Sequence, residues 1–142
     1  MKKTVAILIF FSFFTFSCSN NSSEKDSAGK QSYEKTKQEL LKKEQKNPRD
    51  FLVVDGHDNR NFFGQTVIKG KITNKATVAV FKDVKVKLSF YSKTMALLES
   101  DDETVFELLH PGETKSFKTK YFAPKGTDSV ALAIIGAKVV IE

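Results

Sequence analysis

Apolar and polar residues alternate along most of the second half of the chain. In Asp83–Tyr91, every second residue from Val84 to Phe90 is apolar. A period of two is typical of a half-buried antiparallel strand. Thr66–Asn74 alternates in the same way, with Ile68 and Ile72 on one face. Further strands are predicted over Phe51–Val54, Met95–Glu99, Thr104–Leu109, Lys115–Tyr121 and Val130–Ile141.

Turn-forming residues separate these segments. They are Asp55-Gly56, Asn74-Lys75, Ser92-Lys93, Pro111-Gly112 and Pro124-Lys125-Gly126. About seven short strands within residues 50–142 predict an all-β fold, an antiparallel β-sandwich. The last strand is apolar on both faces, so either it is central or it loses its alternation at a bulge near Gly136.

The first apolar run of the chain has a different character. Val5–Phe16 is 12 residues long and follows the basic Met1-Lys2-Lys3. A bilayer span needs about 20 apolar residues, so this run is too short to cross a membrane and instead suits the apolar region of a signal peptide. We expect residues 1–17 to be that signal peptide.

Cys18 is the only cysteine of the chain, which excludes an intramolecular disulfide and a site of several thiolates. It ends the apolar run directly, after Thr15-Phe16-Ser17 and before a Ser/Asn tract. This arrangement resembles a lipobox, with Phe16 larger than usual, as lipoproteins of the flavobacterial type tolerate. The resemblance implies lipidation of Cys18 and anchoring to a membrane. The alternative is an ordinary secretory signal with an incidental cysteine.

The residue after the cysteine indicates whether the lipoprotein stays in the inner membrane or moves to the outer membrane. It is Ser19, whereas an Asp there would resemble an inner-membrane retention signal, so we expect a cell-envelope lipoprotein of the outer membrane. Residues 22–26 weakly resemble the charged export tag of surface lipoproteins in the Bacteroidetes. Both the periplasmic and the surface face of that membrane stay open.

Residues 18–49 form a polar tether. Residues 19–32 lack any apolar side chain larger than alanine, which predicts disorder. Residues 33–45 are good helix formers with alternating charges, Glu44 among them, and Asn47-Pro48 should end this helix. With Tyr33, Leu40 and Leu41 as its only apolar residues, we interpret it as a solvated spacer; a helix lying on an anionic membrane is the alternative.

The positive charge of the chain sits mainly outside the predicted sandwich. The net charge is +6, but residues 50–142 hold 13 basic and 12 acidic side chains, whereas residues 18–49 hold eight and five. A nucleic-acid-binding protein normally carries its basic patch on the folded module. We therefore expect no nucleic-acid partner.

A family resemblance lies in residues 67–122. It is carried by Gly70-Lys71-Ile72-Thr73-Asn74, Val84–Tyr91, and Leu109–Thr114 followed by Phe117. These resemble immunoglobulin-like domains of the FxLYD type from exported prokaryotic proteins, and also a group of flavobacterial proteins with the pattern IxGxIxNxATVAxxKDVxVxxxFYSKT. The resemblance implies an immunoglobulin-like sandwich and no particular ligand.

Several residues of this motif have a physical explanation of their own. Asn74 ends a strand, where its side chain can bond local backbone. Pro111-Gly112 sets a tight turn, and Phe90 and Phe117 are expected to fill the core from facing sheets.

Few residues are candidates for chemistry. His57, within Asp55-Gly56-His57-Asp58-Asn59, could ligate a cation with Asp58, but the run lacks calcium-loop and zinc spacing and is interpreted as a polar hairpin turn. Asp101-Asp102-Glu103 could bind Ca²⁺ weakly, and is interpreted as a solvated turn. His110 precedes Pro-Gly in a turn. The sequence has no nucleophile elbow, P-loop or dinucleotide fingerprint, so we expect no enzyme, cofactor or metal.

Two functions remain. The first is a lipid-anchored envelope lipoprotein with a non-catalytic immunoglobulin-like binding domain and an envelope protein partner. Its contacts would be sheet edges and the aromatic residues Tyr91, Phe62 and Phe63, although core filling is favoured for the two phenylalanines. The alternative is a lipoprotein that binds a small ligand, a glycan or Ca²⁺. The oligomeric state stays open.

Overall fold

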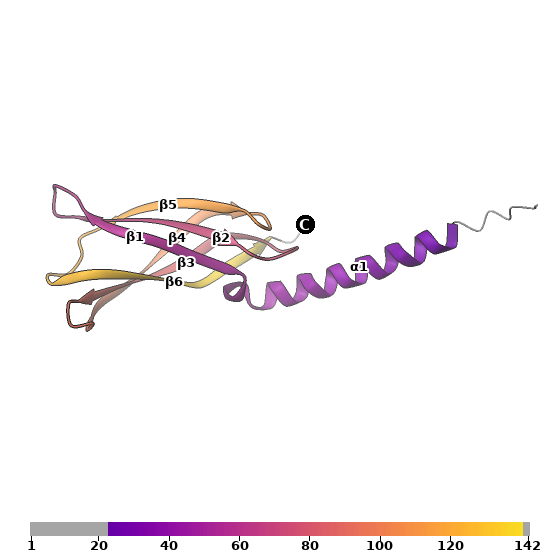
Figure 1. Ribbon diagram of the computed structural model, residues 1–142, viewed down its shortest axis with the longest axis horizontal. Helices are drawn as coiled ribbons and strands as arrows, with labels where there is room; N and C mark the ends of the chain where they lie inside the picture. The colour runs from indigo at the N-terminus through magenta and orange to yellow at the C-terminus, as the bar shows by residue number, and fades with distance from the viewer. Residues whose placement is uncertain (1–22, 141–142) are drawn as a thin grey trace, which may run out of the picture.

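The computed structural model describes residues 23–140 as one helix followed by a two-layer β-sandwich (Figure 1). The helix α1 covers Ser23–Lys46, and a 3-10 turn, η1, covers Pro48–Asp50. The strands are β1 Leu52–Arg60, β2 Thr66–Asn74, β3 Val80–Ser92, β4 Leu97–Leu109, β5 Thr114–Tyr121 and β6 Thr127–Val140. The predicted signal peptide, Cys18 and tether residues 19–22 lie outside the described residues.

Two sheets of three strands form the sandwich, in the orders β1-β2-β5 and β4-β3-β6. All neighbouring strands are antiparallel, which confirms the predicted all-β sandwich. The described strands number six because Leu97–Glu99 of the predicted strand Met95–Glu99 and the predicted strand Thr104–Leu109 belong to one strand, β4, while Met95 and Ala96 lie in the loop before it. The acidic run between them is not a turn. It stays extended because β3 pairs with it, and Asp102 lies opposite the oppositely charged Lys87.

The core lies between the sheets and is built mainly on β3. Its buried side chains from β3 are those of Phe81, Val84, Val86, Leu88 and Phe90, and Ile68 and Ile72 of β2 face them. Phe90 is fully buried as predicted, and Phe117 packs against the same cluster from β5. Alternation along the strands therefore identified the inner face correctly.

The expected turn at Asp55-Gly56 is wrong, because both residues lie within β1. Gly56 pairs with Gly70 of β2, and a Cβ on Gly56 would lie 2.6 Å from Cδ1 of Leu132 on β6. A Cβ on Gly70 would overlap the ring of Phe117. Glycine is needed at position 56 for the close approach of β6 of the other sheet, and at position 70 for the Phe117 ring of the neighbouring strand, rather than for reversing the chain.

The predicted Pro111-Gly112 turn is confirmed and joins β4 of one sheet to β5 of the other. The N–H of Glu113 donates to the carbonyl of His110 at 3.0 Å, and Gly112 has a φ of 77°, which glycine adopts without strain. The bulge expected near Gly136 is also present: opposite Lys85 and Val86, the β6 partners skip from Gly136 to Ile134. β6 is an edge strand of its sheet.

The helix is longer than predicted. It begins at Ser23 rather than at Tyr33, so residues 23–32 are helical rather than disordered. A helix satisfies its own backbone hydrogen bonds, and once the docked end exists each further residue adds one bond at low cost. The polar composition of 23–32 therefore does not prevent helix formation.

Candidate functional site

The helix is joined to the sandwich by the carboxylate of Glu44, whose side chain is only 2% exposed. Oε1 accepts hydrogen bonds from the N–H and the hydroxyl of Thr77, at 2.8 and 2.6 Å. Oε2 accepts from the N–H groups of Val78 and Ala79, at 3.0 and 2.8 Å. Three consecutive backbone N–H groups of the β2–β3 loop thus converge on one anion. The expectation that Glu44 lies on a solvated helix face is wrong.

Leu41 adds an apolar contact to this joint. It lies three residues before Glu44, on the same face of α1, and packs against the core cluster. The last turns of the helix are therefore docked on the sandwich, whereas Tyr33 stays exposed. The solvated-spacer interpretation fails at the junction, since two of its side chains hold the arm to the domain.

Asn74 shapes the loop that receives Glu44. Its Nδ2 donates to the carbonyls of Ala79 and Leu109, at 2.9 and 3.0 Å, and its Oδ1 accepts from the N–H of Ala76 at 2.9 Å. The side chain is fully buried. The predicted bonding of Asn74 to local backbone is confirmed, and its consequence is a loop whose N–H groups face the helix.

The charge of Glu44 is stabilised at this place. Burial of the Glu44 carboxyl would by itself raise its pKa, but the hydrogen bonds from Thr77, Ala79 and Val78 outweigh burial and hold the pKa below its ordinary value. The group is therefore ionised at neutral pH, and the joint is closed under those conditions.

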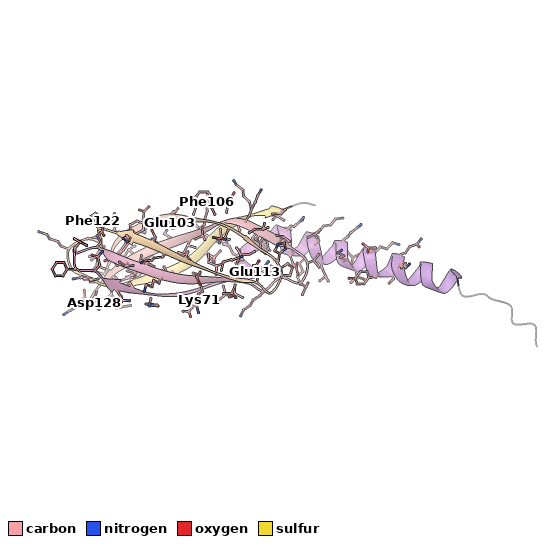
Figure 2. All side chains as sticks on the ribbon, turned by 90° about the horizontal axis from the view of Figure 1, so that it is seen from above. Lys71, Glu103, Phe106, Glu113, Phe122 and Asp128 are labelled. Atoms are coloured by element: carbon pink, nitrogen blue, oxygen red, sulfur yellow. The ribbon has the colours of Figure 1, made fainter. Side chains whose placement is uncertain are left out.

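The opposite end of the sandwich displays apolar side chains. The β1–β2, β3–β4 and β5–β6 loops all lie at that end, away from α1 (Figure 1). They carry Phe62 (99% exposed), Phe63 (81%), Met95 (73%) and Phe122 (77%), of which Phe122 is labelled at this end in Figure 2. We call these four residues the distal tip. The expected core filling by Phe62 and Phe63 is wrong, while their alternative role as contacts stays a prediction.

The β1–β2 loop is built to hold its two rings outward. The Asn61 Oδ1 accepts hydrogen bonds from the N–H groups of Phe63 and Gln65, at 3.0 and 2.9 Å. The Asn61 Nδ2 donates to the Gln65 side chain at 3.0 Å, and the rings of Phe62 and Phe63 pack edge to face with centroids 6.1 Å apart. The exposed aromatics therefore sit on a fixed turn rather than on a slack loop.

The outer face of the β1-β2-β5 sheet carries lysines. Lys69 and Lys71 of β2 and Lys118 and Lys120 of β5 are all exposed, and we call these four the basic face. Lys69, Lys71 and Lys118 line a hollow of about 530 Å³, with Gly56 and Gly70 also in its lining. His57 of β1 also lines it, so this histidine lies on a sheet face and not in a hairpin turn.

The edges of the two sheets are linked by Glu103 of β4. Its Oε2 accepts hydrogen bonds from the Thr119 and Tyr121 hydroxyls of β5, at 3.0 and 3.1 Å. Burial of the Tyr121 hydroxyl raises its pKa, and so do its hydrogen bond to Glu103 and the negative charge of Glu103. Together they raise the pKa of Tyr121 to about 12. Glu103 thus acts in holding the sheets together.

The structure disperses the acidic candidates for a cation site. Successive residues of a strand point to opposite faces, so Asp102 lies across the sheet from Asp101 and Glu103, and Asp58 likewise lies across from His57. His110 is exposed at its turn. Within residues 23–140, the structure brings together no group of three or more His, Cys, Asp or Glu side chains suited to a metal ion.

Sequence reasoning missed both Glu44 and the clustering of the lysines. The partners of Glu44 lie 33 to 35 residues away, and only its spacing from Leu41, just before Asn47-Pro48, could have signalled a docked helix end. The lysine cluster depends on the pairing of β2 with β5, which alternation within each strand cannot supply.

Comparisons with known proteins give little beyond this geometry. No protein-family model matches the chain, and no curated protein matches its sequence. Among solved structures it is similar to the trimeric lipoprotein SadB of Salmonella enterica, with 13% identity and a TM-score of 0.46, over 84% of this chain and 80% of that one. At that similarity neither the assembly nor the role of SadB carries over. Within the described residues, no helix is both long and apolar enough to cross a membrane.

Proposed function

We propose that this chain is a lipid-anchored envelope lipoprotein whose sandwich is a non-catalytic module that binds an envelope protein through the distal tip. The observation that carries the proposal is the tip itself: four large apolar side chains, each at least 73% exposed, at the end of the molecule away from the helix. A Phe side chain buries about 150–250 Å² when it is covered, so the tip exposes several hundred Å² of apolar surface. Large exposed apolar side chains gathered at one end of a molecule favour an interaction site there.

The position of the tip relative to the anchor supports the same function. The lipobox-like Cys18 precedes α1 by only a few residues, and the docked end of α1 lies at the other end of the sandwich from the tip (Figure 1). The helix of 24 residues spans about 36 Å, and the 14-residue β6 about 45 Å. The Glu44 joint holds these two parts end to end. A lipid on Cys18 would therefore hold the tip up to about 80 Å from the membrane surface.

The described carboxyl groups with specific hydrogen bonds are used in structure, which favours binding over catalysis. Glu44 closes the helix joint and Glu103 links the sheet edges. The hydroxyl groups that these two carboxylates accept from, those of Thr77, Thr119 and Tyr121, have no histidine or lysine of the described residues among their hydrogen-bond partners. The sequence also contains no catalytic motif, so we propose a binding module rather than an enzyme. We propose that it is anchored to the outer membrane, on either the periplasmic or the surface face.

Recovery of partners from crosslinked envelopes tests the proposal. The full-length lipoprotein and its Phe62→Ser/Phe63→Ser variant are expressed in the native host, crosslinked in intact cells and purified under denaturing conditions. We expect a discrete protein adduct with the unmodified chain and its loss with the variant. Recovery of the chain always alone, under several growth conditions, would contradict a protein partner.

A matched control distinguishes binding through the distal tip from non-specific hydrophobic binding. Phe106 of β4 is 80% exposed but lies away from the tip (Figure 2). Phe106→Ser removes a ring of the same size and exposure, so it should leave the adduct intact. Equal loss with Phe106→Ser would show that apolar surface in general, and not the distal tip, makes the contact.

A further inference from the structure

The pairing of β2 with β5 places lysines directly opposite one another on the outer face of the sandwich. In the antiparallel register Lys69 faces Lys118, and His57 of β1 faces Lys69 from the other side. Lys71 and Lys120 occupy the next outward positions along the same two strands. Like charges directly opposite each other in a sheet are destabilising. The fold therefore maintains a repulsive arrangement that a sequence selected for stability alone would avoid.

Acidic side chains do not neutralise this face. Among the described residues the two ion pairs join Lys115 to Glu113 and Lys138 to Asp83, and neither uses a lysine of the basic face. Asp55, opposite Lys71, is the one acidic residue among the outward positions of β1, β2 and β5. Four lysines thus face one carboxylate, in a domain whose overall charge is nearly balanced.

The shape of the face fits an extended ligand. Lys69, Lys71 and Lys118 border a hollow of about 530 Å³. Thr73 and Thr114 occupy the next outward positions after Lys71 and Ser116, and their hydroxyl groups lie 2.9 Å apart. Strands lie about 4.8 Å apart and outward positions repeat about every 6.6–6.8 Å along a strand, which sets the spacing of the lysine Cα atoms. Lysine is a flexible point charge with three rotatable donors, so such an array tolerates anions at variable spacing.

We propose that the basic face binds a linear anionic polysaccharide, whose carboxylate or sulfate groups contact Lys69, Lys71, Lys118 and Lys120. Thr73, Thr114 and Ser116 supply hydroxyl partners for the sugar rings. The outward positions of the described strands β1, β2 and β5 include no Phe, Tyr or Trp, so the face lacks the row of large rings on which successive bases stack. It also lacks the apolar wedge that insertion into a bilayer needs, since the exposed rings lie at the distal tip.

The test measures binding of the detergent-purified full-length chain to immobilised alginate and heparin, with dextran as the neutral polysaccharide. We expect binding to both anionic chains and none to dextran. Lys69→Ser/Lys118→Ser should weaken binding at least tenfold and flatten the dependence of log affinity on log salt by about two, roughly one for each lysine removed. Lys82→Ser/Lys85→Ser removes the same charge from the other sheet and should change affinity less than twofold.

Thermal melting of the same variants guards against a folding artefact. Because the opposed lysines repel each other, Lys69→Ser/Lys118→Ser should melt at or above the temperature of the unmodified chain. Unchanged affinity in this variant, equal loss in Lys82→Ser/Lys85→Ser, or binding to dextran would overturn the proposal. Tighter binding to duplex DNA or to anionic vesicles than to alginate and heparin would also overturn it. Phe62→Ser/Phe63→Ser should bind alginate normally, so the proposals for the basic face and for the distal tip are tested independently of each other.

Discussion

Removing the Glu44 carboxylate should release the helix from the sandwich. Glu44→Ala deletes the acceptor of four hydrogen bonds and leaves the N–H groups of Val78 and the buried Ala79 without a partner. A hydrogen bond to a charged acceptor contributes about 1.5–3 kcal/mol, and an unsatisfied buried donor costs a similar amount. Bonds that share one carboxylate are not additive, and water can replace it at the exposed Thr77. We therefore expect a loss of about 3 kcal/mol in helix docking.

Two variants calibrate this magnitude. Glu44→Gln keeps one oxygen but loses the second acceptor, so it should lose about half as much as Glu44→Ala. Glu39→Ala removes a carboxylate from an exposed position of the same helix, so it should have no effect on docking. Amide hydrogen exchange at Val78 and Ala79 measures the opening of the joint, and urea unfolding measures the stability of the whole domain.

The joint should also open in acid. The pKa of Glu44 is held below its ordinary value of 4.5. A lowered pKa in the folded state means that the carboxylate contributes its stability fully above about pH 4.5 and loses it as the pH falls through the folded-state value. The difference in stability between the unmodified chain and Glu44→Gln should therefore shrink on acidification below pH 4.5.

One result would refute this account of the joint. If Val78 and Ala79 stay as protected in Glu44→Ala as in the unmodified chain, the carboxylate does not hold the helix. Equal loss of protection in Glu39→Ala would assign the effect to helix charge in general.

Three further predictions concern the anchor, the sheet packing and the sheet edge. Cys18→Ser should abolish incorporation of a palmitate analogue, and a variant that still takes up the label would contradict lipidation at this residue. Gly70→Ala should cost roughly 1–3 kcal/mol in urea unfolding, since its Cβ would overlap the Phe117 ring, and Phe117→Leu should recover part of the loss; an unchanged stability would refute the close-packing argument. Tyr121 should ionise near pH 12 in a tyrosinate absorbance titration. Because its pKa is raised in the folded state, the stability that the Tyr121 hydroxyl contributes is complete below about pH 10 and is lost as the pH rises through about 12. An unaltered titration curve in the Tyr121→Phe variant would contradict this assignment.

Local patterns predicted most of the fold. Alternation gave β2 with its observed bounds, Thr66–Asn74, and it gave the inner face of β3. The bond between the Asn74 side chain and Ala76 and the Pro111-Gly112 turn were also predictable, because in each the hydrogen-bonded partners lie only two or three residues apart. Features that depend on a few consecutive residues can be derived from those residues.

Features that depend on distant partners could not be predicted. Asp55-Gly56 suggested a turn because Asp-Gly commonly forms one. The glycine is instead required because Leu132 of the other sheet packs closely against position 56. Glu44 resembles any other charge of a polar helix until the β2–β3 loop is placed against it. Phe62 and Phe63 were expected in the core because large apolar residues usually lie there, and only the loop geometry set by Asn61 shows them facing outward.

The most direct test of the proposed function is site-specific photocrosslinking in intact cells. A photoreactive amino acid is placed at position 62 of the distal tip in one strain and at position 106 of β4 in another, both in the full-length chain. The account predicts a discrete adduct, heavier than the lipoprotein, from position 62 and none from position 106. No adduct from position 62, or the same adduct from both positions, would contradict an interaction through the distal tip.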